Sequence, residues 1–260
     1  MSRELYAVLA DVSTYGTVSI YTPYASISAN TYLLPPPTTI VGALSYAYSR
    51  SLNSFRELTE DGYSPAIELI ERKKVLYTAA GMVKPITVSR SIEKLYQHIY
   101  LKKPHWRKPE MAYTIGVRPV ATVDRLQILL IISDKDLLRY CYGIARLGRK
   151  ESLVAIDDVV SVPLREALAK IEYCETGFYF PLSIAVDYSP RDLWMEVDIP
   201  ILNRDNYAKR TAILERYVLP KPFSDAKATV HLNKDGAALK IRKRDGEIVE
   251  VPVPRHALEL

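Results

Sequence analysis

The 260-residue sequence has little cysteine, histidine and glycine: it contains two, four and ten of these residues, respectively. Cys141 and Cys174 are too few for a disulfide framework or a thiolate zinc site, and no histidine lies at ligand spacing from them. No apolar run approaches the roughly 20 residues of a membrane-spanning helix, and the apolar start of the chain is shorter than the core of a secretory signal. We therefore expect a cytoplasmic protein without a metal or other cofactor.

Motifs of the commonest catalytic classes are also missing. The sequence contains no Walker loop, dinucleotide-binding glycine pattern, zincin motif or nucleophile elbow. The adjacent carboxylates Asp157 and Asp158 fall in an expected strand, where neighbouring side chains point to opposite faces, which argues against a metal pair. One catalytic arrangement is still allowed by the residue types. It is metal-independent RNA cleavage, for which His98, His105 and nearby lysines and tyrosines could supply the acid, the base and the cation.

What the sequence does have is positive charge gathered in one segment. The formal net charge is +5, yet residues 84–118 alone hold eight basic and two acidic residues, so the rest of the chain is slightly acidic. Tyr96, Tyr100, Trp106 and Tyr113 lie between these cations. Cations for phosphates and rings for bases are what a groove for single-stranded nucleic acid requires. A solvated loop without function has the same composition. No amphipathic helix organises the charges, which argues against a membrane surface.

Residues 34–44, Leu-Pro-Pro-Pro-Thr-Thr-Ile-Val-Gly-Ala-Leu, predict the start of a helix that runs from Thr38 to about residue 52. Proline is tolerated in the first turn of a helix, and Thr38 or Thr39 can cap that turn through its hydroxyl. We expect the first N–H groups of the helix to face outward as an anion site. Gly42 lowers helix propensity, and we attribute it to the close approach of another backbone segment.

The order of the expected elements predicts an α+β fold. Apolar runs indicate strands near residues 5–12, 75–80, 123–132 and 153–162, with one helix after the first strand and one, capped by Ser133 or Asp134, after the third. This βαββαβ order is typical of a ferredoxin-like or RNA-recognition-motif domain, which we place at residues 1–162. The basic segment 84–118 is then a projecting insertion between the middle strands.

A mainly β region is expected over residues 163–260. We predict a strand at 192–202, an amphipathic helix at 205–217 and a three-stranded meander at 227–253, because Asp-Gly pairs at 235–236 and 245–246 mark turns. A second basic cluster consists of Lys240, Arg242, Lys243 and Arg244. It fits a nucleic-acid contact and a charged edge strand equally well.

Two motifs resemble the Cas-five (Cas5) family of CRISPR-associated proteins, part of the RAMP superfamily. The first is the Pro-Thr segment and small-residue helix at 35–44, preceded by Tyr15-Gly16, and the second is Gly-Arg-Lys-Glu-Ser-Leu at 148–153. The second motif is similar to the archaeal type I-A branch. The resemblance implies a non-catalytic subunit of a type I-A Cascade complex in antiviral defence. Such a subunit binds the 5′ handle of the guide RNA (crRNA), and a β-hairpin thumb at the basic insertion bends over it.

The resemblance also implies which residues and partners are involved. RNA contacts are expected from Tyr15, Pro36, Pro37, Thr38, Thr39, Arg90, Lys94, His98, Lys102, Lys103, His105, Trp106, Arg107, Lys108, Arg149 and Lys150. The expected partners are the crRNA and the Cas-seven backbone subunit, with helicase-nuclease and small subunits and target DNA nearby. A metal-independent endoribonuclease that processes repeat RNA, as in subtype I-C, is the alternative. A scaffold whose basic segment binds an acidic protein is the second alternative.

Overall fold

A four-stranded antiparallel sheet lies at the centre of the computed structural model, which describes residues 4–23, 30–52, 64–96, 113–208 and 212–259. Its strands are β1 (Tyr6–Tyr15), β3 (Val75–Met82), β6 (Arg125–Ile132) and β7 (Leu153–Pro163). They lie in the order β3-β6-β1-β7, so the four strands predicted from the apolar runs are confirmed as one sheet. β6 lies between β3 and β1. Every residue of β6 after Arg125 is buried, as expected for a strand that is covered on both faces of the sheet.

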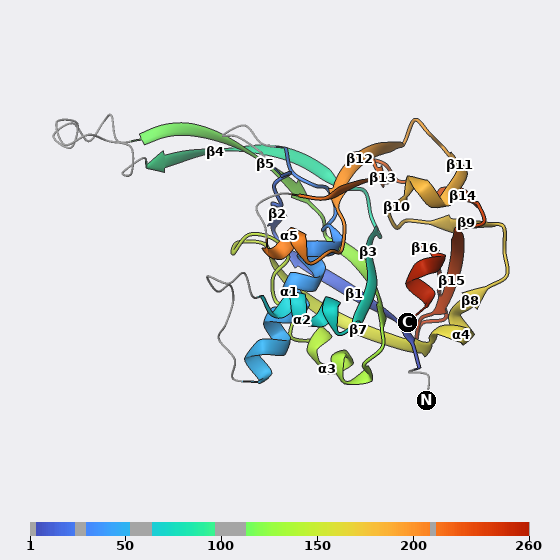
Figure 1. Ribbon diagram of the computed structural model, residues 1–260. Coiled ribbons are helices and arrows are strands. Elements are labelled where there is room, and N and C mark those ends of the chain that lie inside the picture. Colours follow the sequence, from blue (N-terminus) through green and yellow to red (C-terminus); the bar gives the residue numbers. More distant parts are fainter. Residues whose placement is uncertain (1–3, 24–29, 53–63, 97–112, 209–211, 260) are drawn as a thin grey trace.

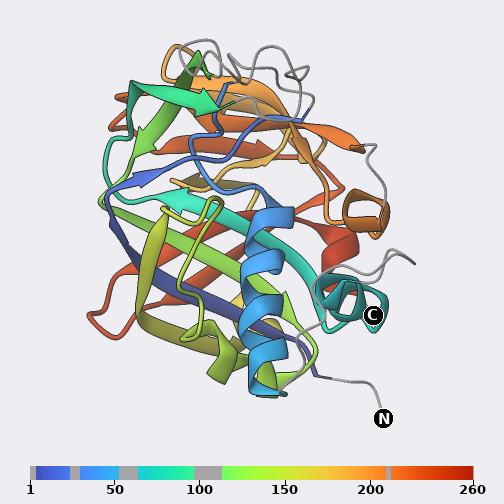
Figure 2. The same ribbon diagram turned by 90° about the vertical axis from the view of Figure 1, so that its left-hand side faces the viewer.

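Helices α1 (Pro37–Ser51) and α3 (Leu138–Cys141) lie against one face of this sheet, and α2 (Pro65–Glu71) packs beside α1 (Figures 1 and 2). As predicted, Asp134 caps the turn before α3, where its carboxylate accepts the N–H of Asp136 at 3.1 Å. That helix is shorter than expected. Within the described ranges, no helix has both the length and the apolar character needed to cross a bilayer.

Strands β4 (Thr87–Tyr96) and β5 (Tyr113–Thr122) form a long antiparallel ribbon where the sequence predicts a projecting insertion and the resemblance implies a β-hairpin. The short strand β2 (Thr17–Val18) pairs with the root of β5. Figure 1 shows the ribbon leaving the body of the molecule, and Figure 2 shows that it projects from the side that carries α1. The strand predicted at 123–132 begins only at Arg125, because β5 ends just before it.

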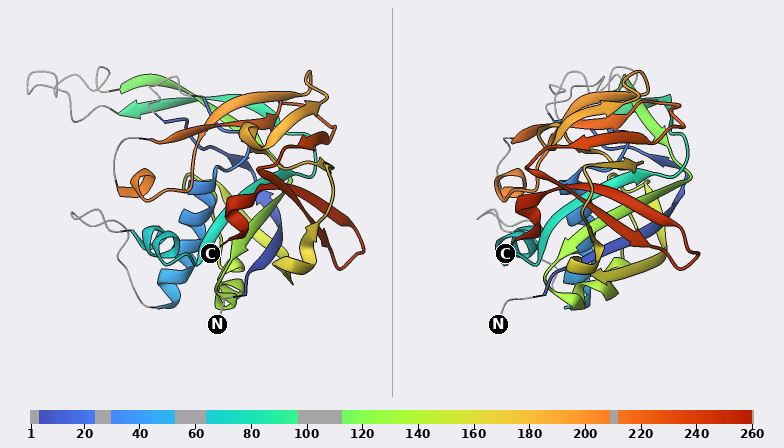
Figure 3. Two further views of the ribbon diagram at one scale, coloured as in Figure 1. Left: turned by 45° about the vertical axis from the view of Figure 1, so that its right-hand side comes forward. Right: turned by 90° about the vertical axis from the view of Figure 1, so that its right-hand side faces the viewer.

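The C-terminal part of the chain is built mostly of strands, in three further three-stranded sheets with orders β10-β13-β12, β11-β14-β9 and β16-β15-β8. Their bounds are β8 Leu168–Ala169, β9 Tyr173–Thr176, β10 Phe180–Pro181, β11 Ala185–Ser189, β12 Trp194–Pro200, β13 Leu214–Pro220, β14 Ala228–Leu232, β15 Gly236–Arg242 and β16 Ile248–Pro254. Short helices α4 (Leu164–Ala167) and α5 (Asp205–Ala208) join them. The β15–β16 hairpin crosses the face of the central sheet opposite α1 (Figure 3).

The helix predicted at 205–217 is wrong. Only α5 is helical there, and the second half of the segment is strand β13, which pairs with β12 along its whole length. The pairing places Arg216 opposite Asp198, and their side chains form an ion pair at 2.5 Å. Tyr217, Val218 and Leu219 are all buried, so this strand is stabilised by its partner strand and by burial that local periodicity does not reveal.

The meander predicted at 227–253 is half right. β15 and β16 form the expected hairpin, and Gly246 at its turn has a φ of +92°. β14, however, pairs with β9 and β11 instead of β15. β15 pairs with β16 along its whole length but with β8 only at Ala238 and Leu239, so the second basic cluster lies beyond the part of β15 that has partners on both sides. Its ammonium groups form ion pairs: Lys240 with Glu250 at 2.7 Å, and Lys243 with Asp11 of β1 at 3.0 Å.

One hydrophobic core runs through both parts of the chain. The edge of β3 is covered by the segment before β10, because Gly177 accepts the N–H of Met82 (3.0 Å) and Tyr179 donates its N–H to Ala80 (3.1 Å). The fit is close at Gly81, where an added Cβ would lie 2.6 Å from the ring of Phe178. The C-terminal strands therefore complete the packing of the central sheet.

Candidate functional site

The start of α1 is held by its own backbone. Pro36 is the N-cap residue, and among the described residues no side chain caps the helix. The carbonyl of Pro36 accepts the N–H groups of Thr39 (3.0 Å) and Ile40 (3.2 Å). The predicted threonine cap is therefore wrong, and these two N–H groups do not form the expected outward-facing anion site. Pro36 and Pro37 are buried, so only Thr38 and Thr39 of this group of predicted contacts reach the surface.

Two tyrosines from the C-terminal part of the chain also hold the start of α1 in place. The hydroxyl of Tyr179 donates to the carbonyl of Pro35 at 3.0 Å, and that of Tyr207 donates to the carbonyl of Thr38 at 2.6 Å. Burial raises the pKa of Tyr207 far above its usual range, so its phenol stays a proton donor. The beginning of α1 thus has a fixed position relative to α5 and β10.

The second motif, residues 148–153, forms a turn that packs on the segment after β2. Gly148 has a φ of +94°, and an added Cβ would lie 2.6 Å from Cγ1 of Ile20 and 2.8 Å from the carbonyl oxygen of Ser19. The N–H of Ser19 donates to the hydroxyl of Ser152 at 3.1 Å, and the N–H of Arg149 donates to the carbonyl of Ser19 at 3.3 Å. Both the positive φ and the close contacts require glycine at this position, which lies well beyond the end of α3 at Cys141.

Three of the predicted contact residues lie at or beside this turn. The guanidinium carbon of Arg149 lies 4.9 Å from the centre of the Tyr21 ring, and Lys150 is exposed beside Glu151. Tyr15, at the end of β1, is 64% exposed and is paired in the sheet with Leu153. These residues place cations and rings around the second motif.

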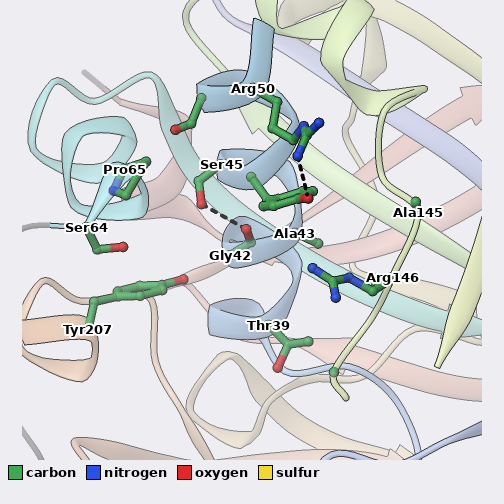
Figure 4. A pocket seen from close by; sticks show the side chains of 13 residues that line it. Thr39, Gly42, Ala43, Ser45, Arg50, Ser64, Pro65, Ala145, Arg146 and Tyr207 are labelled. Carbon is green, nitrogen blue, oxygen red and sulfur yellow. Dashed lines mark hydrogen bonds between the residues drawn. The ribbon is translucent and has the colours of Figure 1, made fainter. Parts of the chain in front are cut away.

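The two motifs meet at one pocket of about 520 Å³ between α1, α2, α5 and the loop before Gly148 (Figure 4). Thr39, Gly42 and Ala43 line it from the first motif, and Gly148 lines it from the second. A convergence of segments that lie far apart in the sequence marks this pocket as the candidate site.

Two arginines give the pocket its charge. Arg50 donates to the hydroxyl of Tyr46 at 3.2 Å, and the guanidinium carbon of Arg146 lies 5.2 Å from the centre of the same ring. Both side chains point toward the pocket in Figure 4. The described lining residues include no aspartate or glutamate. A guanidinium held on an aromatic ring keeps its charge and its N–H donors, so the pocket suits an anionic or planar ligand.

Gly42 differs from the prediction. No backbone segment approaches it closely: among the described residues, an added Cβ would meet no atom within 4 Å. The glycine instead faces the open pocket. Its missing side chain therefore enlarges the pocket and does not serve helix packing.

The remaining predicted contacts are in the ribbon. Arg90 is exposed on β4, and for Lys94 the structure describes only the backbone of that strand. His98, Lys102, Lys103, His105, Trp106, Arg107 and Lys108 lie outside the described residues. Their roles stay predictions.

Sequence reasoning missed Tyr46, Arg50, Arg146 and Tyr207. A signal was present for the first two, because Gly42, Tyr46 and Arg50 recur every four residues and thus share one face of α1. No local pattern marked Arg146 or Tyr207, which reach the pocket from a loop and from α5.

Groups for metal binding or thiol chemistry are not assembled in the described part of the chain. No cluster of three histidine, cysteine or acidic residues there could hold a metal ion. Asp157 accepts the hydroxyl of Ser13 at 2.5 Å, whereas Asp158 pairs with Arg244 at 3.3 Å, so these two carboxylates have separate partners. Burial raises the pKa of both Cys141 and Cys174 to about 12, which keeps both thiols protonated and unreactive.

Known proteins with related sequences carry one family name. Two proteins of Saccharolobus solfataricus, CRISPR system aCascade subunit Cas5 1 and CRISPR-associated protein Cas5 3, are each 26% identical to this chain over 175 residues. The match covers 65% of this chain and 69% of each relative. The chain is thus similar in sequence to Cas5 proteins of an archaeal CRISPR system. No family model matches the sequence, so this likeness depends on the pairwise similarity.

A solved structure has a similar fold. A CRISPR protein from Archaeoglobus fulgidus superposes on 95% of this chain, and on 99% of its own length, with a TM-score of 0.59 at 18% sequence identity. At this identity the likeness concerns the fold alone. The likeness extends through the C-terminal sheets, so the arrangement of both parts of this chain also occurs in the archaeal protein.

Proposed function

We propose that this chain is the subunit of a type I-A Cascade complex that binds the 5′ handle of the crRNA in antiviral defence. The observation that carries the proposal is the pocket where both motifs meet, with two guanidinium groups and no carboxylate among its described lining. The names of the two relatives, a Cascade subunit and a CRISPR-associated protein, support it. So does the strand order β3-β6-β1-β7 with α1 and α3 on one face, which we assign to a ferredoxin-like domain over residues 1–162.

In this proposal the RNA follows the exposed side of α1. Arg146 and Arg50, positioned by Tyr46, offer N–H donors to phosphates and a guanidinium plane on which a base stacks. Thr39 adds a hydroxyl, and the open side of Gly42 gives the RNA room to approach the helix. Arg149, Lys150 and Tyr15 extend the same surface beyond the pocket.

The ribbon supplies the remaining charge. Residues 84–118 hold the positive excess of the whole chain, and the ribbon projects from the side of the molecule that carries α1. We assign it the role of a thumb that covers the bound RNA. The proposed protein partner is the Cas-seven backbone subunit, with helicase-nuclease and small subunits and target DNA nearby.

Arg146→Ala tests the pocket. Its loss removes a charge-assisted contact, so the dissociation constant for handle RNA is expected to rise by roughly 10-fold or more. Arg139→Ala is the matched control, because Arg139 also lies on a tyrosine ring, 4.8 Å from the centre of Tyr140, but does not line the pocket. Fluorescence anisotropy with labelled handle and scrambled RNA, in the presence of the backbone subunit, measures both variants. Equal affinities for the two variants would place the RNA elsewhere.

We also propose that the chain does not cut RNA. Labelled repeat RNA incubated with the protein in EDTA should remain intact, since EDTA silences contaminating metal-dependent nucleases but not a Tyr/Lys/His mechanism. The readout is a denaturing gel. A single cut at the 5′ edge of the handle that disappears in His98→Ala or His105→Ala would establish the endoribonuclease alternative.

A further inference from the structure

The turn between β13 and β14 holds a phenylalanine in an unusual backbone conformation. Phe223 has a φ of +64°, in the left-handed region that bulky residues avoid. The N–H of Ser224 donates to the carbonyl of Lys221 at 3.1 Å, which closes a four-residue turn with Pro222 in its second position. A turn with proline second and a positive φ third normally has glycine or asparagine in that third position. Phenylalanine is therefore strained in the backbone conformation of this turn.

The Phe223 ring lies largely outside the core of the described part of the chain. The side chain of Phe223 is 66% exposed, whereas those of Phe178 and Phe180 are at most 1% exposed. The N–H of Phe223 does donate to the carbonyl of Ile86 at 2.7 Å, at the root of the ribbon, but glycine would form the same backbone bond. A strained residue that persists without an internal benefit indicates a role in binding.

The surroundings of the ring favour a protein over RNA. Pro222 is exposed beside it, and exposed Val83 and Pro85 shortly precede Ile86. Lys221 and Lys84 have partners within the chain: Lys221 donates to the carbonyl of Asp192 at 2.7 Å, and Lys84 forms an exposed ion pair with Asp124 at 3.8 Å. An aromatic ring among apolar neighbours is typical of the centre of a protein interface. A base-stacking ring is usually accompanied by free cations.

We infer that Phe223 is an anchor that inserts into an apolar pocket of another protein subunit of the same complex. The inference rests on the proposed function, in which the chain works as part of an assembly. Two backbone hydrogen bonds fix the turn before binding, so little backbone entropy is lost when the partner covers the ring.

The test uses Phe223→Ala and Phe223→Gly in the full chain, each co-expressed with the other Cascade subunits and the crRNA of its own CRISPR locus. Both variants should enter the purified complex roughly 10-fold less than the wild type, the effect of an interface hot spot. The isolated Phe223→Gly variant should melt at or above the wild-type temperature, because glycine relieves the backbone strain. Val186→Ala, a control at a residue that is 71% exposed on β11, should assemble normally.

Handle binding is measured on the same variants, so the proposed function is scored separately from the anchor. Normal incorporation of Phe223→Ala would overturn the inference. So would a loss of handle affinity with unchanged subunit contacts, since the ring would then be a stacking platform for RNA. A clear drop in the melting temperature of Phe223→Gly would also overturn it, by showing that the ring stabilises this chain.

Discussion

Two glycines at the candidate site lack a side chain for opposite reasons. Gly148 has a φ of +94° and no room for a Cβ, because Ile20 and the carbonyl of Ser19 are too close. Gly42 lies within α1, and among the described residues no atom lies within 4 Å of where its Cβ would be. The first glycine is required by the fold, and the second leaves space in the pocket.

Alanine substitutions distinguish these roles. Gly148→Ala should lower the free energy of unfolding by about 2 kcal/mol, from left-handed strain and the contacts with Ile20 and Ser19. Gly42→Ala should raise it by about 0.5–1 kcal/mol, because alanine is the better helix former, yet it should weaken handle binding by filling the pocket. Urea denaturation and RNA titration measure the two effects. A destabilised Gly42→Ala variant would contradict this account of the pocket.

The role of a single residue could be predicted only where it depends on the neighbouring sequence. Glycine tolerates the left-handed conformation that Gly148 adopts, so a turn at this glycine is consistent with the local sequence. Gly42 could equally reflect close packing or an open surface, and only its spatial neighbours distinguish the two. The threonine cap failed because the carbonyl of Pro36 already accepts the N–H groups that a cap would use.

At the scale of elements, Lys243 ties the β15–β16 hairpin to the central sheet. Its side chain is only 13% exposed and contacts Asp11 of β1 at 3.0 Å as well as Glu247 at 2.9 Å. Burial by itself lowers the pKa of Lys243, but its hydrogen bonds to Glu247 and Asp11 outweigh burial and raise that pKa above its usual value. Since the pKa is raised on folding, this stabilisation is fully present at neutral pH and is lost only as the pH rises through the folded-state pKa.

Lys243→Met should therefore lower the free energy of unfolding at pH 7 by about 1–2 kcal/mol, because it leaves Asp11 and Glu247 without their shared cation. Lys240→Met is the control: it removes an ion pair with Glu250, but the Lys240 side chain is 43% exposed, so a smaller loss is expected. Equal losses in urea denaturation would show that Lys243 is an ordinary surface lysine.

Elements were predictable where burial imposes a pattern on the sequence. The four central strands are apolar runs, and all four were found. β4 and β5 were implied only by the family resemblance, because the charges and prolines of residues 84–118 indicated a projecting insertion without a core pattern. β13 was predicted as part of a helix, and β14 was predicted to pair with β15. Both errors arose because pairing of β13 with β12, and of β14 with β9 and β11, depends on packing between distant segments.

At the scale of the whole molecule, the candidate site depends on both parts of the chain. Tyr179 and Tyr207 reach back from the C-terminal part to the carbonyls of Pro35 and Thr38, and one core joins the two parts. The sequence motifs indicated where the N-terminal half of the site lies. They could not indicate these tyrosines, because a hydrogen bond between distant segments produces no recurring pattern in the sequence.

The most direct test of the central claim is photo-cross-linking of handle RNA that carries 4-thiouridine, in the assembled complex, followed by mass spectrometry of the linked peptides. The account predicts cross-links to α1, to the turn at residues 148–153 and to the ribbon of β4 and β5. Cross-links confined to the C-terminal sheets would contradict it. So would an assembled complex in which this chain is never cross-linked, a result that would favour the protein-scaffold alternative.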